Sequence, residues 1–146
     1  MKTLNTTAIA AAIGLVFSAG ALAQSLPKSE YKAEEDRIAD TYKLDKAKCD
    51  SHSGNKKDVC IAEAKGNEEI AKAELEARAE PSAKHHYDVL LAKADAEYAV
   101  AKEKCDDQAG DARDVCVTEA KAVETRAKAE AEMEMKTWKA NQSASK

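Results

Sequence analysis

The sequence is poor in residues that interrupt helices or fill a large core. Of its 146 residues only two are proline and five are glycine, and aromatic side chains make up 4% of the chain. After residue 23 no apolar run approaches the roughly 20 residues that a membrane-spanning helix needs. No basic block occurs either, although nucleic-acid binding normally requires a concentrated positive face. We therefore expect no nucleic-acid partner, and no stable membrane insertion once residues 1–23 are removed.

Alanine, glutamate and lysine dominate the rest of the chain. Charged residues make up 34% of the sequence, with both signs interspersed and a formal net charge of −4. This composition at helical periodicity is typical of long exposed helices or a coiled coil. The expected fold class is therefore all-α.

The first 23 residues resemble a secretory signal peptide. Lys2 precedes an apolar run over residues 8–17, and residues 21–23, Ala-Leu-Ala, carry small side chains where a signal peptidase cleaves. Cleavage would leave Gln24 as the new N-terminus. An uncleaved anchor is the disfavoured alternative because the apolar run is short. We expect the mature chain in the periplasm or secreted.

The segment 40–78 recurs without a gap at 96–134, with 18 of 39 positions identical. Each copy contains two cysteines separated by ten residues. The mature protein is therefore expected to be two copies of one helical unit.

Turn signals place the helix ends inside these copies. Residues 51–54, Ser-His-Ser-Gly, interrupt the first copy, and Asn55 is expected to cap the following helix. Residues 108–110, Gln-Ala-Gly, act in the same way in the second copy. Between the copies, Pro81 ends one helix and Ser82 is expected to cap the next.

These signals predict two tandem helical hairpins, forming an elongated array or a loose bundle. The predicted helices are 29–52, 55–79, 82–108 and 111–139. The corresponding segments are a signal peptide at 1–23, hairpin repeats at 24–80 and 81–140, and a disordered tail at 141–146.

The cysteines of each copy lie equally far on either side of the expected turn. This symmetry favours the disulfides Cys49–Cys60 and Cys105–Cys116, each stapling one hairpin in an oxidising compartment. If the helix instead ran through Gly54, residues eleven apart would share a face, and Cys49–Cys116 and Cys60–Cys105 would join the copies. That is the twin-cysteine arrangement of coiled-coil-helix-coiled-coil-helix proteins, which space the cysteines by nine and lack the glycine. Spacing alone leaves both connectivities open.

Large apolar side chains are few, so the helices are expected to pack through thin, alanine-rich seams. Charge pairs at helical spacing should add about 0.2–0.5 kcal/mol each. The expected pairs are Glu68–Lys72, Glu74–Arg78, Glu124–Lys128 and Glu132–Lys136.

The segment from Tyr42 to Cys60, followed by Glu63-Ala64-Lys65, resembles the repeat of small exported alanine- and lysine-rich proteins of proteobacteria. By composition the chain is also similar to the helical domain of the cell-envelope protein TolA. The resemblance implies a helical fold and an envelope location. It carries no catalytic residue.

Residues capable of chemistry are sparse. His52, His85 and His86 are candidates for a small metal or ligand site, but adjacent histidines on a helix point about 100° apart. The cysteines lack the short spacing of zinc or thiol-redox motifs, and no catalytic motif or cofactor signature is present. Met133, Met135 and Trp138 near the C-terminus are expected to pack against a neighbouring helix, or to contact a membrane or partner.

These observations favour a non-enzymatic structural or protein-interaction protein of the cell envelope, with no cofactor, no metal and a protein partner or self-association. The alternative is a small-ligand or metal-binding stress protein that uses the three histidines. A thiol oxidoreductase is the third and weakest hypothesis.

Overall fold

The computed structural model describes residues 26–144, and these residues form four α-helices and no strand. The helices are α1 (Lys28–Lys48), α2 (Asn55–Ala79), α3 (Ala83–Cys105) and α4 (Asp111–Ala144), with a short 3₁₀ turn η1 (Cys49–Ser51) after α1. The predicted all-α fold of two stapled hairpins is confirmed. The predicted signal peptide lies outside the described residues.

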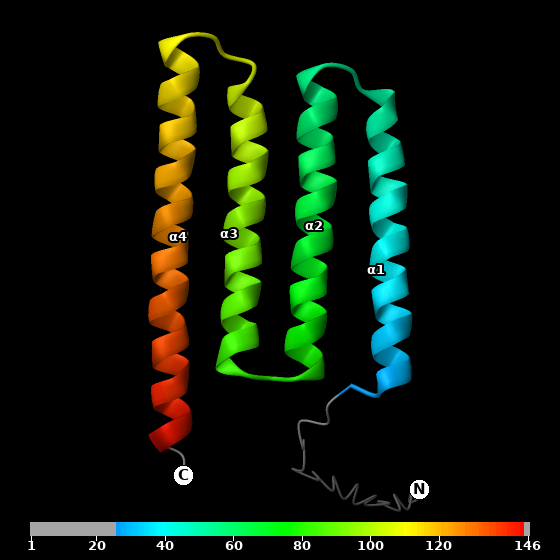
Figure 1. Cartoon of the computed structure of the whole chain (residues 1–146), viewed down its shortest axis with the longest axis vertical. Helices are drawn as coiled ribbons and strands as arrows, with labels where there is room; N and C mark the ends of the chain where they lie inside the picture. The colour runs from blue at the N-terminus through cyan, green and yellow to red at the C-terminus, as the bar shows by residue number, and fades with distance from the viewer. Residues whose placement is uncertain (1–25, 145–146) are drawn as a thin grey trace, which may run out of the picture.

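The four helices stand side by side in one layer, in chain order, and run alternately up and down (Figure 1). Within residues 26–144, α1 contacts only α2 and η1 among the other elements, α2 also contacts α3, and α4 contacts α3 alone. No helix is therefore enclosed by the others. Both faces of the layer and the outer edges of α1 and α4 are open.

The helix ends follow the predicted turns with two differences. The first and third helices end earlier than predicted, at Lys48 and Cys105, because tighter turns follow them. Asn55 does not cap α2, since Gly54 occupies that position with a φ of 58°. A positive φ is a conformation that glycine adopts without steric cost. Ser82 does cap α3, because its hydroxyl accepts a hydrogen bond from the amide of His85 at 3.0 Å.

The last helix is longer than predicted. It continues to Ala144, so residues 141–144 are helical where a disordered tail was expected. No proline or glycine follows Gly110, and the Ser143 hydroxyl donates to the carbonyl oxygens of Lys139 and Ala140. Residues 145–146 lie outside the described part of the chain.

The buried side chains form thin seams between neighbouring helices. Leu75, Cys49 and Cys105 are the largest side chains that are fully buried, and small residues supply much of the remaining core. Because alanine buries little apolar area, each seam gains little from the hydrophobic effect. This is why covalent staples and ion pairs matter to the layer.

The α2–α3 seam, which joins the two repeats, contains a close approach between the helices. Gly66 faces Ala96, and a Cβ atom added to Gly66 would lie 2.7 Å from the Cβ of Ala96. In the second repeat the equivalent of Gly66 is Ala122, which is exposed on α4. The repeats therefore differ at the position where one docks on the other.

Candidate functional site

Both disulfides lie at the same end of the layer, beside the turns that join the helices of each hairpin. Cys49 is bonded to Cys60 with a Cα–Cα distance of 5.6 Å, and Cys105 to Cys116 with a distance of 5.7 Å. The local connectivity is thus confirmed, and the alternative that joined the two repeats is wrong. The physical reason is the glycine turn, which reverses the chain midway between the cysteines.

Solvent has little access to one cysteine of each disulfide. Cys49 is 0% exposed and Cys105 is 1% exposed, while their partners are half-buried. Thiol exchange requires a thiolate to reach a disulfide sulfur, and burial hinders that attack. The placement suits structural bonds.

Ion pairs within single helices follow the predicted spacing in three of four cases. The Nζ–Oε distances are 2.9 Å for Lys72–Glu68, 2.7 Å for Lys128–Glu124 and 2.8 Å for Lys136–Glu132. The predicted Glu74–Arg78 pair is wrong, since both side chains turn to neighbouring helices.

Pairs between helices hold the layer together along its seams. Arg78 of α2 donates to Glu34 of α1 at 3.1 Å, while Glu74 of α2 pairs with Lys93 of α3, also at 3.1 Å. Exposed pairs of this kind contribute about 0–1 kcal/mol each. Here they fix how neighbouring helices are aligned along their axes, because the alanine-rich seams contain few large side chains that could do so.

Glu124 is the one buried charged residue among those that the structure describes, with 5% of its surface exposed. Its carboxylate lies 2.7 Å from the ammonium groups of both Lys121 and Lys128, and Lys128 also reaches Asp95 of α3 at 2.5 Å. Hydrogen bonds from the two lysines lower the pKa of Glu124 to about 2. The hydrogen bonds to Asp95 and Glu124 in turn raise the pKa of Lys128. This cluster ties α4 to α3.

Tyr31 makes a similar tie between α1 and α2. Its hydroxyl donates to Oε1 of Glu76 at 2.5 Å, and this bond raises the pKa of Tyr31 to about 12. A phenol that donates to a carboxylate keeps its proton, because ionisation would place two negative charges together.

The three histidines do not form one site. His52 is exposed in the first stapled turn, whereas His85 and His86 begin α3 at the opposite end of the layer. The Nδ1 of His85 donates to the carbonyl oxygen of Glu80 at 2.6 Å, and Nε2 of His86 lies 2.8 Å from Oε1 of Glu134. Within residues 26–144 no group of three or more His, Cys, Asp or Glu is placed to hold a metal ion.

The apolar residues near the C-terminus have different environments. Trp138 stacks on His86 at the start of α3, with ring centroids 6.3 Å apart and planes 14° from parallel. Met135 is half-buried, but Met133 is 61% exposed on α4. Packing against the neighbouring helix thus accounts for Trp138 and leaves Met133 without a partner in the described chain. No helix in residues 26–144 is long and apolar enough to cross a membrane.

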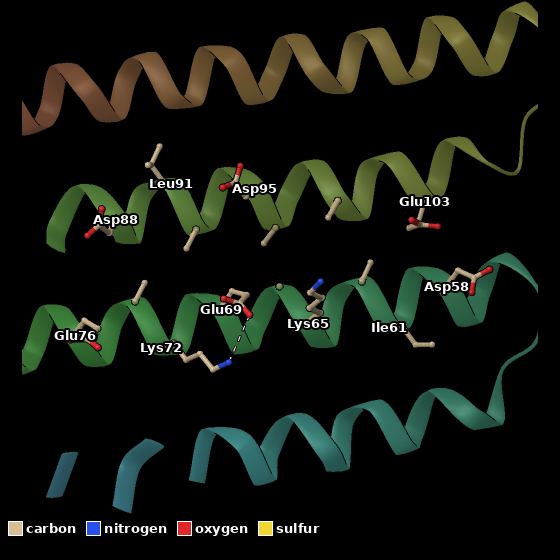
Figure 2. A pocket seen from close by; sticks show the side chains of 16 residues that line it. Asp58, Ile61, Lys65, Glu69, Lys72, Glu76, Asp88, Leu91, Asp95 and Glu103 are labelled. Carbon is tan, nitrogen blue, oxygen red and sulfur yellow. Dashed lines mark ion pairs between the residues drawn. The ribbon is translucent and has the colours of Figure 1, made fainter. Parts of the chain in front are cut away.

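A groove of about 750 Å³ runs along the α2–α3 seam on one face of the layer (Figure 2). Its floor consists of small residues, since the two helices approach closely there. Acidic side chains line its margins: Asp58, Glu69 and Glu76 on α2, and Asp88, Asp95 and Glu103 on α3.

Nearby cations neutralise part of this acidic margin. Asp88 pairs with Lys84 and Asp95 with Lys128, both at 2.5 Å, and Glu69 lies 3.8 Å from Lys72. The groove is an open channel with mixed charge and a shallow apolar floor. Such a surface suits another helix better than it suits a small molecule, which binds in clefts that enclose most of its surface.

A second groove of about 780 Å³ lies over α1, α2 and α3, and Ile38, Tyr42, Val89 and Leu90 are among its apolar lining residues. It takes its residues from faces of α2 and α3 other than those that line the first groove. Both sides of the layer thus offer a surface to a partner. The sequence does not predict these grooves, although Gly66, which stands in the first repeat where the second has Ala122, indicates a close approach at the α2–α3 seam.

Comparison of the chain with models of protein families, with curated proteins and with solved structures finds no match in any of the three.

Proposed function

We propose that this protein is a non-enzymatic structural or protein-interaction protein of the bacterial cell envelope, acting in the periplasm after export. The observation that supports the proposal is the open layer of stapled helices. Four helices that could have buried one another instead leave two faces and two edges accessible, each rich in side chains that can contact a protein.

The disulfides and ion pairs stabilise such an open layer. Closing each hairpin with a disulfide should stabilise it by about 3 kcal/mol on the chain-entropy model. The contacts between α1 and α2 and between α3 and α4 then persist although little apolar area is buried. A preformed surface also binds a partner with a smaller ordering cost.

Site-specific photo-crosslinking in living cells tests the proposal. A photoreactive residue would replace Lys65 on the first face, Glu63 beside Asn67 on the other, or Lys43 and Ala122 on the outer edges. Discrete adducts that form from some of these positions and fail from others would support a defined interaction surface. Absence of adducts from every position would contradict the proposal.

Two further measurements test the location of the protein and the alternative function as a thiol oxidoreductase. Intact mass of the periplasmic form should show a chain beginning at Gln24, and retention of residues 1–23 in a soluble form would contradict export by signal cleavage. The purified protein should not reduce insulin or oxidise a model dithiol faster than free cystine. Catalytic turnover in that assay would favour the thiol oxidoreductase.

A further inference from the structure

The outer edge of α4 carries an apolar stripe that nothing in the described chain covers. Val115 is 56% exposed and Met133 is 61% exposed, and they are two of the four exposed large apolar residues. They are 18 residues apart, which is five turns of an α-helix, so they point in the same direction. Ala122 and Ala129 lie between them on the same side of the helix. We call these four residues the α4 stripe.

The first repeat shows how the helix face that corresponds to the α4 stripe is used. Its counterparts in the first repeat include Gly66 and Ala73 of α2, which line the seam where α2 docks on α3. The same helix face is therefore covered in the first repeat and uncovered in the second. α4 contacts α3 only, on its opposite side.

The outer edge of α1, which is the other open edge of the layer, does not carry an apolar stripe at the corresponding positions. Where α3 presents Ala92, Ala96 and Ala99 to α2, the equivalent positions of α1 hold Asp36, Asp40 and Lys43. Charged residues on the outermost unit keep a repeat array from growing. The α4 edge thus keeps an apolar stripe beside Glu119 and Arg126, whereas the α1 edge holds charged residues at the corresponding positions.

The α4 stripe is complementary to itself in an antiparallel pair. A two-fold axis that lies between the two α4 helices, perpendicular to them and at the level of residue 124, places Val115 of each copy against the partner's Met133, and Arg126 against the partner's Ala122. Arg126 then lies about 4.5 Å along the helix axis from the partner's Glu119, at 1.5 Å per residue. Neither Arg126 nor Glu119 has an ion pair within residues 26–144, and both are exposed. The pairing therefore brings together opposite charges twice, between the two Val115–Met133 contacts at its ends.

We propose that α4 is the dimerisation helix of this protein and that its occupant is the α4 of a second copy. The two-fold contact would join two layers edge to edge into a layer of eight helices. Because an isologous contact uses the same patch on both subunits, it closes after two copies. The charged α1 edges then lie at the two far ends. This inference rests on the proposed interaction function and names the partner and the surface.

The test is the association state of the purified full chain, measured by sedimentation velocity from low micromolar to submillimolar concentrations. The parent should form a dimer. Val115→Lys should weaken dimerisation about tenfold or more, because the lysine would have to be desolvated in the contact. Leu44→Lys is the matched control: Leu44 is 65% exposed, but it lies on α1, and its replacement should leave the dimer unchanged.

A charge exchange tests the geometry. Arg126→Glu and Glu119→Arg should each weaken the dimer by placing like charges together, whereas an equimolar mixture of the two variants, or the double variant, should restore it. All these positions are exposed, so helical circular dichroism should be unchanged in every variant.

Three outcomes would overturn the inference. They are a monomer at all concentrations, a dimer that Leu44→Lys disrupts, and a dimer that the charge exchange leaves unaffected or fails to restore. If the chain is monomeric yet photo-crosslinks to other envelope proteins in cells, the proposed function stands and only the dimer fails. If it is monomeric and yields no adducts, both fail.

Discussion

Because α2 and α3 approach closely at Gly66, we expect its replacement by alanine to destabilise the protein, which is the opposite of the usual effect in a helix. Replacing glycine by alanine inside a helix ordinarily stabilises it by about 1 kcal/mol. At Gly66 the new Cβ would lie 2.7 Å from the Cβ of Ala96 and 3.4 Å from its Cα. Carbon atoms in contact prefer about 3.5–4.0 Å, so one helix must move away by about 1 Å.

That movement has a cost because both atoms are fixed to the backbone and no side-chain rotation can relieve the contact. Overpacking of this kind typically costs about 1–3 kcal/mol. After subtracting the gain in helix propensity, Gly66→Ala should lower the free energy of unfolding by about 1 kcal/mol. For a domain of this size the thermal midpoint should fall by about 4 °C.

The assay is thermal unfolding followed by circular dichroism with the disulfides intact, and the repeat supplies the control. At concentrations where the chain is monomeric, Ala122→Gly, at the equivalent exposed position of α4, should destabilise by the propensity difference of about 1 kcal/mol alone. The double variant Gly66→Ala with Ala96→Gly exchanges the two methyl groups across the seam. It should be more stable than the sum of the single changes predicts, with a coupling of about 1 kcal/mol or more.

A different result would refute the close approach. If Gly66→Ala raises the midpoint as an exposed glycine replacement does, and Ala96→Gly adds only its own propensity cost, the helices are not in contact at this point.

Three other predictions test the supports of the layer. The double change Cys105→Ala with Cys116→Ala should remove part of the roughly 3 kcal/mol of stability expected from the disulfide and so lower the thermal midpoint clearly. Most of the helical circular dichroism should survive at low temperature, because helix propensity is unchanged. An unchanged midpoint would contradict the structural role of this disulfide. The pKa of Glu124 is about 2 in the folded state, against an ordinary value of 4.5. The ionised carboxylate therefore contributes roughly 1–3 kcal/mol to the free energy of unfolding. This contribution is fully present above pH 4.5 and is lost as the pH falls towards 2. Glu124→Gln should therefore flatten the pH dependence of stability in that window, and an unchanged acid titration would count against the buried ion cluster. His86→Ala should shift the fluorescence of Trp138, the single tryptophan, to longer wavelength as its stacking partner is removed, and unchanged emission would show that the two rings are not in contact.

Much of the local structure follows from the sequence because its signals act over short distances. The glycine turns at Gly54 and Gly110 and the equal spacing of the cysteines around them predict both hairpins and both disulfides, which the structure confirms. Three of the four ion pairs predicted between residues four apart, Glu68–Lys72 among them, form as predicted because they depend only on helix geometry. Ser82 likewise caps the helix that directly follows it.

Features that depend on the meeting of two helices were decided by the tertiary structure. Alanine-rich helices have several faces that could pack, so the sequence favoured an elongated array over a compact bundle without deciding between them. Once α2 lies between α1 and α3, Arg78 and Glu74 find partners on opposite sides, and the predicted pair between them is lost. The burial of Glu124 depends likewise on the position of α3 beside α4.

The same distinction explains the candidate sites. The predicted helix 55–79 already separates His52 from His86, because a straight helix of that length holds its two ends far apart. The exposure of Met133 and the close contact at Gly66 required the neighbouring helix to be known. Turns, staples and helices were determined by residues near one another in sequence, whereas the seams, grooves and open edges were determined by packing, where small apolar differences between helix faces select one arrangement.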